Sequence, residues 1–287
     1  MSEYKIITDS GCDLPSQMFK QMDVHYIPLF VNYKGAERED SVDEGVQEMY
    51  AGLRAGEVAT TSAINPDRWA RAMEEVLAQG FDVLTITFSS GLSTTYQSAV
   101  IAGEELKEKY PERKIYVVDG LSASMGQGLL VWYACQKKAE GLSVEELAAW
   151  VEYNRKNLCH WFTVDDLMFL KRGGRVSAAT ALVGTMLQIK PVLHVDNEGK
   201  LINVGKARGR KAAINHLLQK AQELGDGFDN STMFISHGDC VEDAEYLAGQ
   251  LKEKLGVKEV KIGYIGAVIG SHAGPGTLAL FFLGKHR

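Results

Sequence analysis

Short segments rich in hydroxyl side chains, together with one histidine among glycines, are the parts of this sequence best suited to chemistry. The hydroxyl-rich segments are residues 8–11, 59–62 and 88–99, and the histidine is His272 in residues 270–276. Hydroxyls and unpaired backbone N–H groups at strand ends and helix starts form sites for anions. The sequence therefore predicts a site for an anionic head group such as a carboxylate or a phosphate.

Ser93 lies between an expected buried strand, residues 82–88, and an expected helix, residues 94–109. Gly91 can adopt the backbone conformation that a tight turn between them needs, and the Ser93 hydroxyl then lies at the helix start. Two interpretations stay open, because Ser93 can bind a negative charge or can simply cap the helix. Five hydroxyl residues crowd this one turn, and this favours a binding site.

Thr61 and Ser62 lie just before Pro66, which is expected to open a helix. Their hydroxyls can equally be caps or ligand contacts, and the residues alone do not separate the two. In residues 8–11 the same ambiguity holds, and Asp9 is expected to be a structural acceptor for loop amides at the carboxyl edge of a sheet.

His272 lies in the most glycine-rich stretch of the second half of the chain. Gly270 and Gly274 flank it, and Pro275 stiffens the turn that follows. Glycines let the backbone approach a ligand closely. We therefore expect a functional histidine, either a hydrogen-bond donor to a head group or an acid–base residue.

Two basic clusters interrupt an otherwise acidic chain, at residues 171–175 and 206–211. They include Arg175 and Arg208. A run of charge is usually a solvated surface, but each cluster also contains glycine. An anion contact or a docking patch for an acidic partner is the alternative to plain surface.

Composition excludes several classes of protein. The 287 residues include 31 Lys and Arg against 37 Asp and Glu, a formal net charge of −6, which disfavours nucleic acid or an anionic membrane as the main partner. No apolar run approaches the ~20 residues that span a bilayer, and the start of the sequence lacks the features of a signal peptide. A cytoplasmic location is expected. The four cysteines match neither a zinc site nor a disulfide framework, so reduced thiols are expected.

Alternating strand and helix patterns predict an α/β protein of two domains, residues 1–158 and 159–287, with mainly parallel sheets. Strands are expected at residues 4–8, 25–30, 82–88, 115–119, 190–195, 201–205, 233–236, 260–265 and 277–283. Helices are expected at residues 42–53, 66–77, 94–109, 122–139, 144–157, 165–170, 209–224 and 241–255. Both halves supply site-forming segments, so we expect the ligand site at the domain junction.

A serine hydrolase is the alternative function. Gly91 and Ser93 follow a strand and precede a helix, and an acid such as Asp119 or Asp165 followed by His272 matches the residue order of α/β-hydrolases. The last glycine of the nucleophile turn is missing, because Thr95 occupies its place. A nucleotide-binding enzyme has less support, since neither phosphate-binding glycine motif is present. If ATP is used, another chain should bind it.

The ordered set of motifs resembles the DegV family of fatty-acid-binding proteins. The matching segments run through nearly the whole chain: residues 8–10, 59–63, 89–99, 166–167, 170–175, 190–191 and 266–276. This resemblance implies two α/β domains that enclose a long-chain fatty acid. It also implies a role as the non-catalytic, acyl-carrying subunit of bacterial fatty acid kinase, whose separate ATP-binding subunit phosphorylates the carboxylate.

By position, the resemblance implies that Thr61 and Ser93 hold the carboxylate, with Ser62 as a neighbour. It places Arg175, Arg208 and His272 near the head group or on the face presented to the kinase subunit. This chain departs from many relatives after Ser62, where it reads Ala-Ile-Asn-Pro, and at Thr94, where glycine is common. The hydroxyls stay in place, so the departures concern chain-length preference and loop shape.

The expected ligand and partners follow from the same resemblance. The ligand is a long-chain fatty acid, no other cofactor or metal is expected, and the partner is the kinase subunit. Nucleic acid is not expected, and contact with a membrane is at most transient. Candidate residues for the apolar wall are Leu182, Val183, Met186, Leu187, Ile265 and Ile269.

Overall fold

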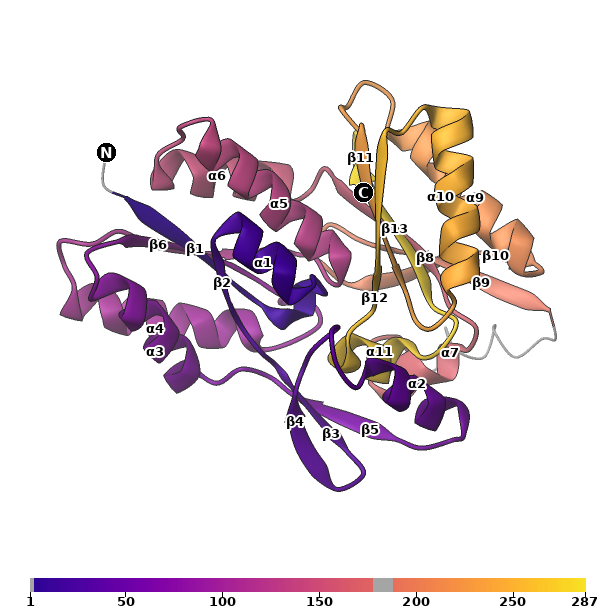
Figure 1. Cartoon of the computed structure of the whole chain (residues 1–287), viewed down its shortest axis with the longest axis horizontal. Helices are drawn as coiled ribbons and strands as arrows, with labels where there is room; N and C mark the ends of the chain where they lie inside the picture. Colours follow the sequence, from indigo (N-terminus) through magenta and orange to yellow (C-terminus); the bar gives the residue numbers. More distant parts are fainter. Residues whose placement is uncertain (1–2, 178–187) are drawn as a thin grey trace.

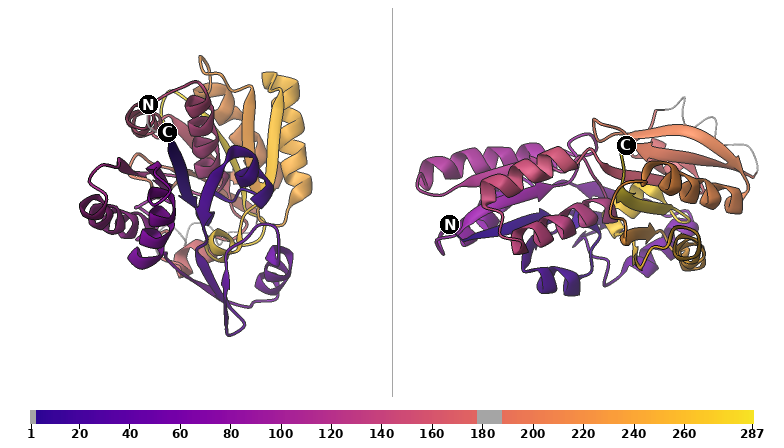
Figure 2. Two further views of the ribbon diagram at one scale, coloured as in Figure 1. Left: turned by 60° about the vertical axis from the view of Figure 1, so that its left-hand side comes forward. Right: turned by 90° about the horizontal axis from the view of Figure 1, so that it is seen from above.

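The computed structural model describes residues 3–177 and 188–287. Three sheets organise the chain, and we call them the first sheet, the small sheet and the second sheet. Figure 1 shows the first sheet toward the N-terminal side and the second sheet beyond helix α5, and the view from above in Figure 2 places the two at opposite ends of the molecule. No helix of the described residues is long and apolar enough to cross a membrane.

The first sheet is parallel throughout and has the order β2-β1-β6-β7. Its strands are β1 (Tyr4–Asp9), β2 (Val24–Ile27), β6 (Asp82–Thr87) and β7 (Ile115–Asp119). Its helices are α1 (Ser16–Met22), α3 (Pro66–Leu77), α4 (Thr95–Lys109), α5 (Met125–Ala139) and α6 (Val144–Asn154).

Each face of the first sheet buries a separate core. On one face Ile6 and Leu84 pack with α5 and α6, and on the other Ile7 and Val83 pack with α3 and α4. Both faces are apolar, which is why these strands are nearly continuous β-branched and aliphatic runs. All four strands end in the same direction, so the loops after them share one edge.

The small sheet is antiparallel and has the order β4-β3-β5. Its strands are β3 (Phe30–Tyr33), β4 (Ala36–Glu39) and β5 (Ala59–Ser62), and α2 (Val46–Arg54) lies between β4 and β5 in the chain. No strand was expected at residues 59–62, but these residues pair with β3 and Thr61 lies opposite Val31. Pairing between distant segments is a tertiary event that the local hydroxyl pattern does not encode.

The second sheet has the order β10-β9-β8-β13-β11-β12. Its strands are β8 (Leu158–Thr163), β9 (Ile189–Val195), β10 (Leu201–Arg208), β11 (Thr232–His237), β12 (Glu259–Tyr264) and β13 (Leu278–Leu283). Its helices are α7 (Leu167–Arg172), α9 (Arg210–Leu224), α10 (Val241–Leu255) and α11 (Ala267–Ala273). One face packs on α9 and α10, and the other faces α5 (Figure 1).

The α/β class is confirmed, but the prediction of mainly parallel sheets holds only for the first sheet. In the second sheet β11 and β12 are parallel, whereas every other pair is antiparallel. A tight turn joins β9 to β10 as a hairpin, and β13 returns between β8 and β11 after α11. Helix and strand alternation along a chain does not set the direction of each strand, because the connection alone decides it.

Candidate functional site

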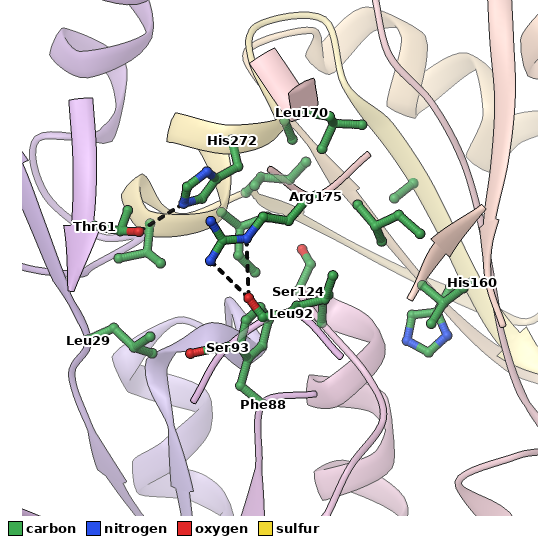
Figure 3. A pocket seen from close by; sticks show the side chains of 18 of the residues that line it. Leu29, Thr61, Phe88, Leu92, Ser93, Ser124, His160, Leu170, Arg175 and His272 are labelled. Atoms are coloured by element: carbon green, nitrogen blue, oxygen red, sulfur yellow. Dashed lines mark hydrogen bonds between the residues drawn. The ribbon is translucent and has the colours of Figure 1, made fainter. Parts of the chain in front are cut away.

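A cavity of about 510 Å³ lies between the first sheet, the small sheet and the second sheet. Figure 3 shows its side chains converging from these elements. One end is polar and is lined by Thr61, Ser62, Ser93, Arg175 and His272. The rest of the wall is largely apolar and includes Leu29, Phe88, Phe162, Val195, Leu201 and Phe281. This arrangement suits a ligand with one polar end and a long apolar body.

The imidazole of His272 contacts Thr61 at the polar end. The His272 Nε2 and Thr61 Oγ1 atoms are 2.8 Å apart (Figure 3). Burial, and to a smaller extent the charge of Arg175, lowers the pKa of His272 to about 4. The imidazole is therefore neutral at pH 7, and one ring nitrogen donates while the other accepts.

Only residues 274–276 of the glycine-rich stretch 270–276 lie outside a helix, because Ala267–Ala273 fold into α11 and place His272 in its last turn. The amides at the start of this helix are satisfied by carboxylates from the first half of the chain. Gly266 donates to Asp13 over 3.0 Å, and Val268 donates to Asp40 over 2.9 Å. Two buried acids therefore fix the helix that carries the histidine.

Gly173 gives the imidazole its space. A Cβ atom at this position would lie 2.1 Å from His272 Nδ1. Gly173 thus has a steric role next to the site. The first basic cluster, residues 171–175, is therefore partly structural. Lys171 and Arg172 end α7, and Gly173 packs against the His272 imidazole.

Arg175 joins the end of α7 to the loop between β6 and α4, residues 88–94, which we call the serine loop. Its Nε and Nη2 atoms donate to the Leu92 carbonyl over 3.2 and 2.9 Å (Figure 3). Its Nη1 atom donates to the Gly173 carbonyl. Burial lowers the pKa of this guanidinium, but arginine stays protonated in proteins. A positive charge therefore lies at the polar end of the cavity.

Ser93 contacts the start of α4 and also lines the cavity. Its Oγ accepts from the Thr95 amide over 3.2 Å and lies 2.9 Å from Thr95 Oγ1. The N-cap residue of α4 is Thr94 and not Ser93, so Ser93 contacts the first helical residue from one position further out and also lies in the cavity wall. Ser62 also lines the wall, and the Asn32 amide approaches its hydroxyl at 3.5 Å.

Asp9 supports the serine loop from below. Its carboxylate accepts from the amides of Phe88 (2.7 Å) and Gly11 (3.0 Å) and from the Gln127 side chain (3.2 Å). Burial raises the pKa of Asp9 to about 7, although these donors oppose the shift. The expectation that Asp9 is a structural acceptor is confirmed.

The site residues expected from the sequence separate into two groups. Thr61, Ser62, Ser93, Arg175 and His272 line one cavity. Arg208 is exposed at the far end of β10 and lies outside the cavity wall formed by the described residues. Its position next to the surface suits a partner contact rather than a head-group contact.

The expected wall residues are described only in part. Ile265 and Ile269 line the cavity. Leu182, Val183, Met186 and Leu187 lie outside the described residues. Sequence reasoning missed three polar residues of the wall, Ser124, His160 and Thr277. Ser124 has a φ of 55°, which a serine rarely adopts, and no local sequence signal marks it.

The geometry favours binding over hydrolysis. A serine hydrolase needs a base hydrogen-bonded to its nucleophile. Here His272 contacts Thr61, while the Ser93 hydroxyl contacts Thr95. The two acids considered for a triad are engaged elsewhere, since Asp165 pairs with Lys190 and Asp119 accepts backbone amides. Among the described residues no cluster of His, Cys, Asp and Glu could hold a metal ion.

Comparisons with known proteins agree with this geometry. The family model described as "Uncharacterised protein, DegV family" matches residues 3–285. A DegV domain-containing protein of Clostridium perfringens, CPE0026, is 48% identical over 286 residues, which are 99% of this chain and 98% of that protein.

Two solved structures share the fold. A DegV family protein from Thermus thermophilus, described as fatty acid binding, aligns with a TM-score of 0.88 and 34% identity over 99% of this chain and 100% of that one. The Fatty Acid Kinase (Fak) B3 protein of Streptococcus pneumoniae, loaded with linoleic acid, aligns with a TM-score of 0.85 over 99% and 100% of the two chains. At 23% identity the second likeness shows the fold alone. From the family model and the Clostridium relative, this chain belongs to the DegV family.

Proposed function

We propose that this protein binds a long-chain fatty acid in the cavity and holds its carboxylate at the polar end. The single observation that carries the proposal is the cavity itself, with apolar walls and one cluster of hydroxyl, imidazole and guanidinium groups. The description of the related Thermus protein as fatty acid binding supports it. The protein then acts as a carrier and performs no chemistry of its own.

The apolar wall supplies the driving force for binding. Burial of each methylene contributes roughly 0.8 kcal/mol. A chain of about 14 to 18 carbons therefore has a gross driving force on the order of 10 kcal/mol, offset in part by the loss of ligand freedom. The head group has only to recover its own desolvation, which requires well-placed donors.

The polar end offers those donors without neutralising the carboxylate. When His272 carries its proton on Nε2, it donates to Thr61 Oγ1 and leaves the Thr61 hydroxyl hydrogen for the ligand. Ser93 supplies a second hydroxyl from the start of α4. The nearby Arg175 charge stabilises the anion at longer range. Neutral donors leave one carboxylate oxygen nucleophilic.

That nucleophilic oxygen suits delivery to a separate kinase subunit. In this step a carboxylate oxygen attacks the terminal phosphorus of ATP, the bond to ADP breaks, and an acyl phosphate forms. The kinase supplies the ATP site, since this chain lacks both phosphate-binding glycine motifs. In the cluster at residues 206–211, Lys206, Arg208 and Lys211 are exposed, and this is the surface that we assign to the kinase contact.

Ligand binding tests the first part of the proposal. Mass spectrometry of gently purified protein should detect bound fatty acid, and calorimetric titration should show binding of palmitate or oleate. Ser93→Ala and Thr61→Val should each weaken binding by about tenfold, because each removes one hydrogen bond to a charged group. Ser98→Ala, in the same helix but outside the cavity wall, is the matched control. A protein that copurifies with no fatty acid and ignores both ligands would contradict the proposal.

The second part of the proposal, delivery of the fatty acid to a kinase subunit, is tested with the same purified protein. With ATP, palmitate and the kinase subunit of the same bacterium, acyl phosphate should form and be trapped by hydroxylamine only when every component is present. Arg208→Glu should slow this reaction and leave palmitate affinity unchanged. Acyl phosphate formation, or tight ATP binding, by this chain alone would show that the carrier role is wrong.

A further inference from the structure

Arg287 is a buried arginine whose guanidinium uses every hydrogen that it can donate. Only 8% of this residue is exposed to solvent. Guanidinium has five N–H donors, and all five meet a neutral oxygen. The acceptors are the carbonyls of Leu158 (3.1 Å), Leu121 (2.6 Å), Asp196 (3.0 Å) and Arg155 (2.6 Å) and the hydroxyl of Ser122 (3.2 Å).

These acceptors come from three separate parts of the chain. Leu121 and Ser122 belong to the loop between β7 and α5, in the first half. Residues 155–158 connect α6 to the second sheet, and Asp196 begins the turn between β9 and β10. Figure 2 shows the end of the chain between the two sheets, where these segments meet. One side chain therefore ties the two halves together.

The turn between β9 and β10, residues 196–200, is also tied to the serine loop. Ser89 Oγ donates to the Gly199 carbonyl over 2.8 Å, and the Ser89 amide donates to Ser122 over 3.0 Å. Within the turn, Gly199 donates to Asp196 over 3.0 Å. The contacts form a closed ring from Arg287 through Ser122, the serine loop and the turn back to Arg287.

This ring holds one wall of the cavity. Val195 and Leu201 flank the turn and both line the cavity, as do Leu92 and Ser93 on the serine loop. If the turn moves away from the serine loop, the wall opens beside the polar end. The position of the turn is thus coupled to how well the cavity encloses an apolar chain.

A buried cation among neutral oxygens is costly. Burial lowers the pKa of Arg287 to about 10, and desolvation of this kind is offset only when the hydrogen bonds are complete. A simple apolar contact would join two halves of a chain at less cost. The guanidinium instead fixes a specific arrangement of three carbonyl-bearing segments, since its donors have a rigid planar geometry.

We propose that Arg287 is a positioning residue that holds the β9–β10 turn against the serine loop and so keeps the cavity closed around the acyl chain. The inference rests on the proposed fatty acid function. Removal of the guanidinium frees the turn, and the ligand then leaves faster while its entry is little changed, as for most weakened complexes.

Arg287→Gln tests this role by two measurements. The first is the rate at which bound palmitate transfers to phosphatidylcholine vesicles, which should rise by about tenfold. The second is amide hydrogen exchange of the protein without ligand, which should rise at residues 194–202. Ser89→Ala cuts a different contact of the same turn and should shift both readouts in the same direction. It keeps the test usable if Arg287→Gln does not fold.

Asn230→Ala is the matched control. Asn230 also bridges two segments through three hydrogen bonds, but its partners Gly225 and Leu283 lie outside the cavity wall. It should lower stability without changing the transfer rate. If the wild-type protein binds palmitate and both turn variants release it at the wild-type rate, the role of Arg287 is wrong while the proposed function stands. If the wild-type protein binds no fatty acid, both fall.

Discussion

At the scale of single residues, burial sets the protonation of the groups around the cavity. His272 is held neutral by burial beside Arg175, whereas burial favours the protonated form of Asp9 beneath the serine loop. Both shifts disfavour the charged form, so they change the pH dependence of stability in opposite directions. Protonation of His272 and ionisation of Asp9 are each opposed in the folded protein. The polar end is thus preorganised by burial as well as by hydrogen bonds.

The stability that His272 contributes should depend on pH. Its pKa is about 4 in the folded protein and near 6.5 when unfolded, so the unfolded chain takes up more protons between these values. The contribution is complete above pH 6.5 and is lost as the pH falls through 4. From about pH 7 to about pH 4, the unfolding free energy of the wild type should fall by on the order of 3 kcal/mol relative to His272→Asn.

Denaturant unfolding of both proteins at several pH values measures this difference. The buried acids Asp9, Asp13 and Asp40 titrate in both proteins, so their effects cancel in the comparison. Parallel pH profiles for the two proteins would show that the imidazole titrates normally in the folded state.

At the scale of elements, the serine loop depends on a glycine where another backbone passes. A Cβ atom at Gly91 would lie 2.7 Å from the Glu198 carbonyl oxygen and 2.8 Å from that of Gly199. These atoms belong to the β9–β10 turn, which cannot yield as the end of a flexible side chain can. Close packing of loop and turn therefore requires the smallest residue at this position.

Gly91→Ala should force the loop and the turn apart. We expect palmitate affinity to fall by about tenfold, with destabilisation of roughly 1–3 kcal/mol from overpacking. Calorimetric titration and denaturant unfolding measure the two effects. Gly249→Ala is the control, because a Cβ atom there meets nothing within 4 Å. Equal affinities for wild type and Gly91→Ala would mean that the contact between loop and turn does not shape the cavity.

At the scale of the whole molecule, the cavity is a shared property of both halves. The loops that follow strands of the first sheet, the small sheet and the second sheet all contribute to its wall, and α5 packs against the second sheet as well as against the first. A ligand in this position contacts elements that are far apart in the sequence. Binding should therefore stabilise the folded chain as one unit.

Fatty acid should raise the stability of the entire chain. At a free palmitate concentration of about 100 times Kd, the unfolding free energy should rise by about 2.7 kcal/mol. Differential scanning calorimetry should show one transition that moves to higher temperature. Two transitions, of which only one responds to palmitate, would contradict a cavity shared between the halves. Thr61→Val should reduce the shift in proportion to its lost affinity.

The sequence alone determined most of the elements of this protein. The helices Pro66–Leu77 and Val241–Leu255 and the strand Ile115–Asp119 begin and end as predicted. Their boundaries are local: Asn65 caps the helix that Pro66 opens, and the buried strand is a short apolar run. The hydroxyl segments and His272 were likewise visible, because residue types and glycine spacing are properties of the chain itself.

Only the tertiary structure decided the features that depend on pairing and packing between distant segments. Thr61 lies in a strand because Val31 pairs with it, and the second sheet is mainly antiparallel because its connections return the chain. Arg208 is exposed and lies outside the cavity wall formed by the described residues, although its sequence cluster resembles that of Arg175. Arg287 gains its five acceptors from segments that lie 91 to 166 residues before it in the chain. Local patterns specify helices and strands, whereas the free energy that places them beside one another comes from contacts that the sequence does not display.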